Sequence, residues 1–303
     1  MNVQQIAIEL KQLQDDICGA LEALDGGAAF HEDNWVRAEG GGGRTRIIQN
    51  GALLSKGGVN FSAVHGPLSE QLRKMLRLDD GDEGGSFFAG GVSIVLHPYN
   101  PHVPIIHMNV RYFEINEQIW WFGGGIDLTP HYIVAEDARF FHQSMKNTCD
   151  KHHKDYYPKF KKWADDYFYI PHRQETRGIG GIFFDRLSEK NTGRSKEELW
   201  AFVRDVGYTF APTYAQIANR RREQAVSEAE LKWQSLRRGR YVEFNLVYDQ
   251  GTKFGLESNG RIESILMSMP PAAQWVYDFT PPEGSPEAQT LSLLRKDIDW
   301  AQL

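Results

Sequence analysis

Three polar side chains alternate with apolar ones near the middle of the chain. His107, Asn109 and Arg111 are separated by single residues within the run 103–114. This alternation is typical of a β-strand, whose successive side chains point to opposite faces, so the three polar groups would form one row. Burying an imidazole, an amide and a guanidinium is costly unless they meet polar partners. We therefore expect other parts of the chain, or a ligand, to meet this row.

Histidines are concentrated in the same part of the sequence, which makes metal binding one candidate chemistry. Eight of the ten fall within one third of the chain: His97, His102, His107, His131, His142, His152, His153 and His172. Neutral imidazole is a common metal ligand. No local spacing such as HExxH is present, so a metal site would have to be assembled from separate elements. For each histidine alone, a hydrogen-bonded and partly buried side chain is the simpler interpretation.

Arginines lie beside glycines, turns or strand interiors at several positions, and together they indicate an anionic ligand. The set is Arg44, Arg46, Arg111, Arg173, Arg177, Arg240 and Arg261. A salt bridge explains each one alone. In a chain with a net charge of −6, the set suggests a ligand with several carboxylates or phosphates, which guanidinium binds bidentately. Because 12% of the residues are aromatic, we expect that ligand to be large and apolar at its centre.

Asp127 is the carboxylate that we select as functional. It follows Gly123–Gly125 at the end of an aromatic segment, where glycine lets the backbone or a ligand approach closely. The alternative is an aspartate that caps a turn or a helix, with Thr129 as the competing cap.

A second glycine cluster, Gly40–Gly43, matches neither the P-loop spacing nor the dinucleotide-binding spacing. A flexible loop or a tight turn is its simplest interpretation. Because Arg44 and Arg46 follow directly, the segment also suggests a mobile strip that closes over an anionic ligand.

Composition indicates a globular protein of a reducing compartment. Of the 303 residues, 41% are hydrophobic and 24% are charged, and the negative net charge argues against general affinity for nucleic acid or anionic membranes. Cys18 and Cys149 provide neither a disulfide framework nor a CxxC metal site. No run is long enough to span a membrane, and the N-terminus lacks the pattern of a signal or transit peptide. We expect a cytoplasmic protein without stable membrane insertion.

Periodicity and capping signals predict an α+β fold. Helices are predicted over residues 3–24, 66–78, 133–151, 157–170, 195–206 and 214–222, and from 286 onward. Strands are predicted over 103–114, 182–185, 241–248, 252–257 and 261–269, with a hairpin turn at Asn259-Gly260. Because strands arrive in hairpins and helices in blocks, we predict one domain over 1–303, with a large, mostly antiparallel sheet covered by helices.

Several long segments resemble the oxygen-dependent coproporphyrinogen III oxidases, and the match is collinear over nearly the whole chain. They are FHEDNWVRAEGGGGRTRI, GVSIVLHPYNPHVPIIHMNVRYFE, WWFGGGIDLTP, KKWADDYFYIPHRQETRGIGGIFFD, YVEFNLVYDQGTKFGL and GRIESILMSMPP. Two details depart from the family pattern. Arg186 follows FFD where the family often has a second acid, and the turn before Arg261 reads Asn-Gly.

The resemblance implies a homodimer with a sheet covered by helices on both faces. It also implies the oxidative decarboxylation of two propionates of coproporphyrinogen III to vinyls, with dioxygen as co-substrate. The products would be protoporphyrinogen IX, carbon dioxide and hydrogen peroxide, in haem biosynthesis. No organic cofactor is implied. A divalent metal is described for some bacterial members and is not expected to be required.

By the same resemblance, the contacts to substrate are assigned to Ser93, Asn109, Val110, Arg111, Asn259, Gly260 and Arg261. His107 matches the proton donor, Asp127 matches the acid that holds the pyrrole nitrogens, and Arg111 would clamp a carboxylate beside them. The metal of the bacterial members would be bound at His97, His107, His142 and His172.

Two other functions fit parts of the pattern. A non-haem metal oxygenase would explain the histidines. A tetrapyrrole-binding protein without catalysis would explain the arginines and the aromatic residues, but the presence of His107, Arg111 and Asp127 together argues against it.

Overall fold

The chain folds around one antiparallel sheet. The computed structural model describes residues 1–68, 70, 73–74, 85–116, 119–257 and 260–302. Seven strands pair in the order β1-β2-β3-β4-β5-β6-β9, each antiparallel to its neighbour. Their bounds are β1 His31–Val36, β2 Gly41–Gln49, β3 Leu54–Pro67, β4 Ser86–Pro98, β5 Ile105–Ile115, β6 Ile119–Thr129 and β9 Gly181–Leu187. A separate hairpin joins β7 Tyr169–Ile170 to β8 Glu175–Thr176.

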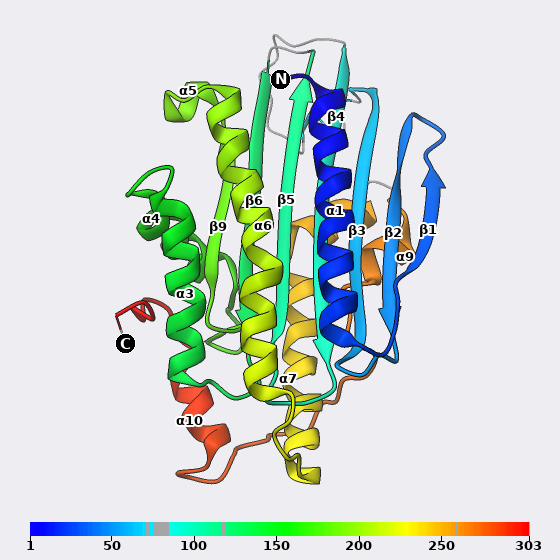
Figure 1. Cartoon of the computed structure of the whole chain (residues 1–303). Helices are drawn as coiled ribbons and strands as arrows, with labels where there is room; N and C mark the ends of the chain where they lie inside the picture. The colour runs from blue at the N-terminus through cyan, green and yellow to red at the C-terminus, as the bar shows by residue number, and fades with distance from the viewer. Residues whose placement is uncertain (69, 71–72, 75–84, 117–118, 258–259, 303) are drawn as a thin grey trace.

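Helices cover both faces of this sheet, as Figure 1 shows: α1, α3 and α6 lie in front of it and α7 and α9 behind it. The helix bounds are α1 Val3–Asp25, α3 Ala135–Asp150, α4 Tyr156–Tyr167, α5 Glu189–Thr192, α6 Lys196–Arg221, α7 Glu228–Val247, α8 Gln250–Glu257, α9 Ile262–Leu266 and α10 Pro286–Leu293. The predicted α+β architecture, with an antiparallel sheet between helices, is confirmed.

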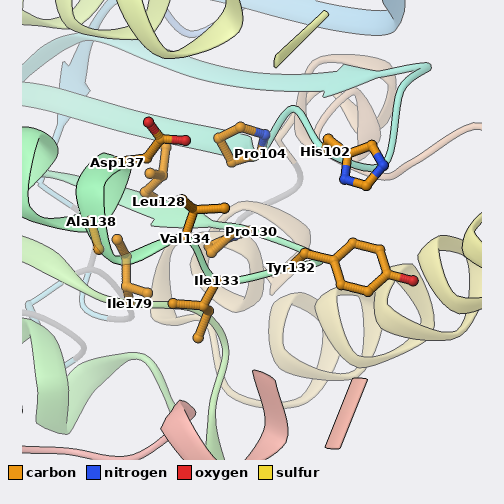
Figure 2. A pocket seen from close by; sticks show the side chains of 10 residues that line it. All are labelled: His102, Pro104, Leu128, Pro130, Tyr132, Ile133, Val134, Asp137, Ala138 and Ile179. Carbon is orange, nitrogen blue, oxygen red and sulfur yellow. The ribbon is translucent and has the colours of Figure 1, made fainter. Parts of the chain in front are cut away.

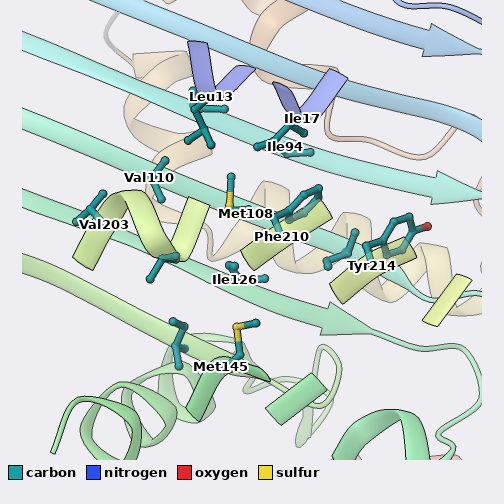
Figure 3. Close-up of a cluster of buried hydrophobic side chains, with 14 of the residues drawn as sticks. Leu13, Ile17, Ile94, Met108, Val110, Ile126, Met145, Val203, Phe210 and Tyr214 are labelled. Atoms are coloured by element: carbon teal, nitrogen blue, oxygen red, sulfur yellow. The ribbon is translucent and has the colours of Figure 1, made fainter. Parts of the chain in front are cut away.

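The main hydrophobic core lies between the sheet and the helices α1, α3 and α6. Figure 3 shows Leu13 and Phe210 from two of these helices beside Met108 and Val110 of β5. Met108 and Val110 have no exposed surface. Because strand side chains alternate, His107, Asn109 and Arg111 must point to the opposite face, as predicted. Burial of one β5 face therefore fixes where the polar row lies.

Helix α7 corrects the strand predicted over 241–248. Ser227 caps the helix by accepting from the backbone of Glu230, whose side chain accepts in return, a capping box that marks the start. Tyr241, Phe244 and Asn245 are buried at helical spacing. The short apolar alternation fits period 2 as well as period 3.6, and tertiary packing selects the helix.

Two further predicted strands are also helical. Residues 252–257 lie in α8 and most of 261–269 lies in α9 or the turn after it, so the predicted hairpin is wrong on both sides. Asn259, its turn residue, lies outside the described residues.

Two helix predictions also change. Residues 195–206 and 214–222 belong to one continuous helix, α6, which accommodates Pro212. Of the helix predicted over 66–78, the first residues belong to β3, and most of the rest falls outside the described residues.

Two buried histidines should make stability depend on pH. Burial lowers the pKa of both His97 and His142 from 6.5 to about 3. Their neutral form is favoured by folding, so this contribution is complete above pH 6.5 and is lost as the pH falls from 6.5 toward 3. We expect each histidine to add up to about 1.4 kcal/mol per pH unit to the slope.

Urea unfolding of wild type and His142→Gln between pH 7 and pH 5 measures this slope. The variant should lose less free energy of unfolding than wild type as the pH falls. Parallel pH profiles for the two proteins would contradict the expectation.

Candidate functional site

Strand register brings the predicted site residues together on one face of the sheet. Asn109 of β5 lies opposite Ser93 of β4, and His107 lies opposite Asp127 of β6. Residues directly opposite in an antiparallel pair point to the same side. We call the sheet face that carries Ser93, His107, Asn109 and Arg111 the site face.

His107 and Asp127 form a hydrogen-bonded pair. His107 Nδ1 lies 2.7 Å from Asp127 Oδ1. A carboxylate can only accept, so Nδ1 donates, and Nε2 is left without a hydrogen-bond partner among the described residues. The His107 side chain is 20% exposed and that of Asp127 is 1% exposed. His107 Nε2 is therefore available to a ligand, whereas the Asp127 carboxylate is buried behind the imidazole.

Arg177 completes the pair from below. Its Nη2 donates to Asp127 Oδ1 at 2.7 Å and its Nε donates to Oδ2 at 3.1 Å. Its guanidinium carbon lies between 4.5 and 4.7 Å from the ring centres of Phe168, Tyr241 and Phe244. The Arg177 side chain is only 1% exposed, so its charge has lost its hydration. Cation–π contacts with these rings and the ion pair with Asp127 compensate for this desolvation cost.

These contacts keep the Asp127 carboxyl ionised. Burial alone would raise its pKa, but Arg177 and His107 outweigh burial and hold the pKa below its usual range. Arg177 was part of the arginine set noted in the sequence, but its partnership with Asp127 was missed. The arginine lies 50 positions away, and no local signal specifies that contact.

Asp127 is shielded from direct contact with a ligand, so its expected contact with the pyrrole nitrogens stays a prediction. Both of its oxygens are already bonded, and the side chain is buried below His107. A pyrrole N–H does not reach such a carboxylate without rearrangement. In this arrangement Asp127 accepts from His107 Nδ1 and so fixes which ring nitrogen carries the proton.

Arg111 is positioned beside the pair by two oxygens. It donates to Asn109 Oδ1 at 2.8 Å and to Asp185 Oδ1 at 2.9 Å. Its side chain remains 36% exposed. Gly123 of β6 lies beneath it, where a Cβ atom would come within 2.7 Å of Arg111 Nε. Asp185 was not among the predicted site residues, although it is the last residue of the strand predicted over 182–185.

The other expected substrate contacts are spread over several elements. Ser93 lies on the site face, but the Val110 side chain is fully buried on the core face, so only its backbone could meet a ligand there. Arg261 forms an ion pair with Asp33. Gly260 is bonded through its backbone N–H to the carbonyl of Gly255 at 2.8 Å. Asn259 lies outside the described residues.

The four histidines considered for a metal are not gathered at one point. His97 bonds the Ser268 carbonyl at 2.8 Å, and His172 lies between Glu243 and Tyr248 at 2.7 Å from each. His142 belongs to α3, on the core side of the sheet. Within the described part of the chain, no group of three His, Cys, Asp or Glu residues could hold a metal ion. This quartet does not fit a shared metal.

The glycine cluster matches its prediction only in part, because Gly40 lies in the tight turn between β1 and β2, with its N–H donating to the Arg37 carbonyl at 3.1 Å. Gly41–Gly43 are part of strand β2 and pair with β3. Arg44 then points to the core side, where it donates to Gln14 and Asp15 of α1, and Arg46 pairs with Asp15 and Glu32. The predicted closing strip is therefore wrong, because paired strand residues do not form a mobile loop.

A small cavity lies away from the site face. Figure 2 shows its lining: His102, Pro104, Leu128, Pro130, Tyr132, Ile133, Val134, Asp137, Ala138 and Ile179. The cavity volume is about 10 Å³, roughly enough for one water molecule. None of the site-face residues lines it, so it is not the ligand site.

No helix in the described ranges is long and apolar enough to cross a membrane.

The fold and the site face define an α+β protein in which a buried Arg–Asp pair supports a histidine beside an exposed arginine. A family model described as coproporphyrinogen III oxidase matches residues 5–300. The chain belongs to this family, which confirms the resemblance found in the sequence.

Two curated relatives carry the name oxygen-dependent coproporphyrinogen-III oxidase, mitochondrial. The Homo sapiens protein is 50% identical over 301 residues, covering 96% of this chain and 65% of the relative. The Rattus norvegicus protein is 49% identical over 306 residues, covering 98% of this chain and 68% of the relative. The chain thus spans about two thirds of the length of these relatives.

Proposed function

We propose that the protein is an oxygen-dependent coproporphyrinogen III oxidase that acts as a single domain. The carrying observation is the His107–Asp127 pair, which is anchored by Arg177 and lies in register beside the exposed guanidinium of Arg111. This arrangement joins a proton-handling group to a carboxylate-binding group. A carboxylate-bearing macrocycle that exchanges a proton at its pyrrole nitrogen uses both groups.

In the proposed reaction each propionate side chain, one dioxygen and one proton become a vinyl group, carbon dioxide and hydrogen peroxide. His107 takes the pyrrole proton at Nε2, which makes the ring electron-rich enough to reduce dioxygen. The reduced oxygen removes hydrogen from the propionate β-carbon, the bond to the carboxylate breaks, and carbon dioxide leaves. The proton held by His107 passes to the peroxide, and solvent returns one to the ring. Two such rounds give protoporphyrinogen IX. We propose no organic cofactor and no required metal.

Arg111 should orient the propionate that reacts. We expect Arg111→Ala to raise KM about 10- to 100-fold, because a charge-assisted hydrogen bond to the carboxylate is lost, and to change kcat less. Steady-state kinetics measure both constants. Arg204→Ala, an exposed arginine on α6 paired with Glu9, is the control. An unchanged KM in Arg111→Ala would rule out the clamp.

One experiment separates the proposed oxidase from the other two functions. Turnover of coproporphyrinogen III is followed with and without dioxygen, and with and without a strong chelator, by product fluorescence after mild oxidation. The oxidase should work only with dioxygen and should keep its activity in chelator. Activity that disappears with chelation indicates a metal oxygenase. Binding without turnover indicates a non-catalytic tetrapyrrole protein.

We also propose a cytoplasmic homodimer without nucleic-acid partners. Free, buried Cys18 and Cys149 fit a reducing compartment. Val36 at the end of edge strand β1 is 90% exposed and Tyr277 is 100% exposed, which leaves apolar surface that a second copy would cover. Light scattering should give twice the monomer mass, and a concentration-independent monomer would exclude the dimer.

A further inference from the structure

The polar row of β5 continues across two more strands. Asn109 lies opposite Ser93 of β4, and Ser93 lies opposite Asn60 of β3. All three side chains are therefore on the site face. Each is partly exposed. We call Asn60, Ser93 and Asn109 the donor row.

Each member of the donor row has an unused hydrogen-bond donor. Asn60 Oδ1 accepts from Thr45 at 2.8 Å, and Asn109 Oδ1 accepts from Arg111 at 2.8 Å. With both amide oxygens engaged, the two Nδ2 groups remain. Neither Nδ2 group, nor the Ser93 hydroxyl, has a hydrogen-bond partner among the described residues. The row thus presents N–H and O–H groups to whatever occupies the site face.

A network behind Asn60 holds its amide in this orientation. Thr45, only 2% exposed, also accepts from Trp35 Nε1 at 3.2 Å and lies 2.7 Å from Ser264 Oγ. Arg261 in turn donates to Ser264 Oγ at 3.3 Å. Fixing the amide in advance lowers the entropy cost of using its free end to bind.

We propose that the β3 end of the donor row, at Asn60 and Ser93, binds a second carboxylate of the ligand, and that Asn60 is a further ligand-contacting residue. This inference rests on the proposed function, since it assigns part of the same site. Adjacent strands are about 4.8 Å apart, so Asn60 lies about 10 Å across the sheet from the β5 residues. Asn60 and Arg111 therefore suit a flat ligand whose carboxylates are about 10 Å apart. Nitrogen and hydroxyl donors favour a carboxylate over a cation.

The test replaces the donor with an acceptor of the same shape. Asn60→Asp keeps the oxygen that Thr45 bonds but places a negative charge where the carboxylate would lie. The probe is coproporphyrin III, the oxidised and unreactive macrocycle, whose binding is followed by quenching of protein fluorescence. We expect binding about 100-fold weaker in Asn60→Asp and about tenfold weaker in Asn60→Ser.

Asn34→Asp is the matched control. It makes the same charge change on β1, where Asn34 lies opposite Arg44 and hence on the core-side face of the sheet. If Asn60→Asp binds the probe as tightly as Asn34→Asp, the inference is overturned. Should Asn60→Asp fail to fold, the probe affinity of Asn60→Ser is compared with that of wild type instead, and equal affinities would overturn the inference. A wild-type protein that fails to bind the probe would overturn the proposed function as well.

A double variant tests whether two different carboxylates are held. If Arg111 and Asn60 bind separate carboxylates, the losses in Asn60→Ser and Arg111→Ala should multiply in the double variant. A double variant no weaker than Arg111→Ala alone would mean one shared carboxylate and would overturn the inference. Turnover of coproporphyrinogen III by Asn60→Ser should show a raised KM with kcat within about threefold, because the residue lies away from His107.

Discussion

Asp127→Asn should lower kcat by about 10²- to 10⁴-fold while changing substrate affinity only a few-fold. Arg177 donates to both carboxylate oxygens, and His107 donates to one of them. An asparagine offers one oxygen, so in either orientation its NH2 group faces a guanidinium N–H. When the NH2 group of the asparagine faces His107, Nδ1 must accept a hydrogen bond, and the imidazole proton moves to Nε2. Nε2 is the atom proposed to take the pyrrole proton, so it can then no longer do so.

The control for this variant is a second aspartate–histidine pair. Asp205 on α6 lies 2.8 Å from His152 Nε2, on the core side of the sheet. Asp205→Asn removes the charge from a pair of the same kind without reaching the site face, and its kcat should match wild type. Thermal melting and binding of coproporphyrin III confirm that Asp127→Asn is folded. A folded Asp127→Asn with near-normal kcat would falsify the assigned role.

Arg177→Met should destabilise the fold by about 3–5 kcal/mol, because it leaves the Asp127 charge buried without its main partner. For a chain of this size we expect the melting temperature to fall by roughly 10 °C. Circular dichroism melts of purified protein measure the change.

The double variant Arg177→Met with Asp127→Asn separates charge from packing. Removing both charges should restore much of the lost stability, since neither is then buried alone. Turnover should stay as low as in Asp127→Asn, because the carboxylate is absent in both. A double variant less stable than Arg177→Met would contradict the electrostatic explanation.

The polar row was predictable because one strand with period 2 carries it. Burial of Met108 on one side leaves His107 and Arg111 on the other, and this follows from the sequence of β5 alone. The pairing of His107 with Asp127 was not predicted, because it depends on the register of the β5–β6 hairpin. Asp127 was selected for its glycines, so the right residue was found without its partner.

The residues around this pair depend on packing between distant segments. Phe168 at the end of α4 and Tyr241 and Phe244 of α7 meet around Arg177, so two distant parts of the chain supply these rings. The local sequence around each ring can predict the end of α4 and one face of α7. It cannot predict that both segments contact Arg177. The misassigned α7 hid two of these rings, although the Ser227–Glu230 capping box is a local signal that would have identified the helix.

The hydrogen bond between Thr45 and Ser264 joins residues 219 positions apart. Closing so long a loop is entropically costly, and contacts of this kind slow the folding of a chain. The support behind Asn60 is complete only after α9 has docked on a sheet whose strands precede it in the chain. During refolding, porphyrin binding should therefore recover later than the far-ultraviolet circular dichroism signal, so that a ligand reports the last step of assembly.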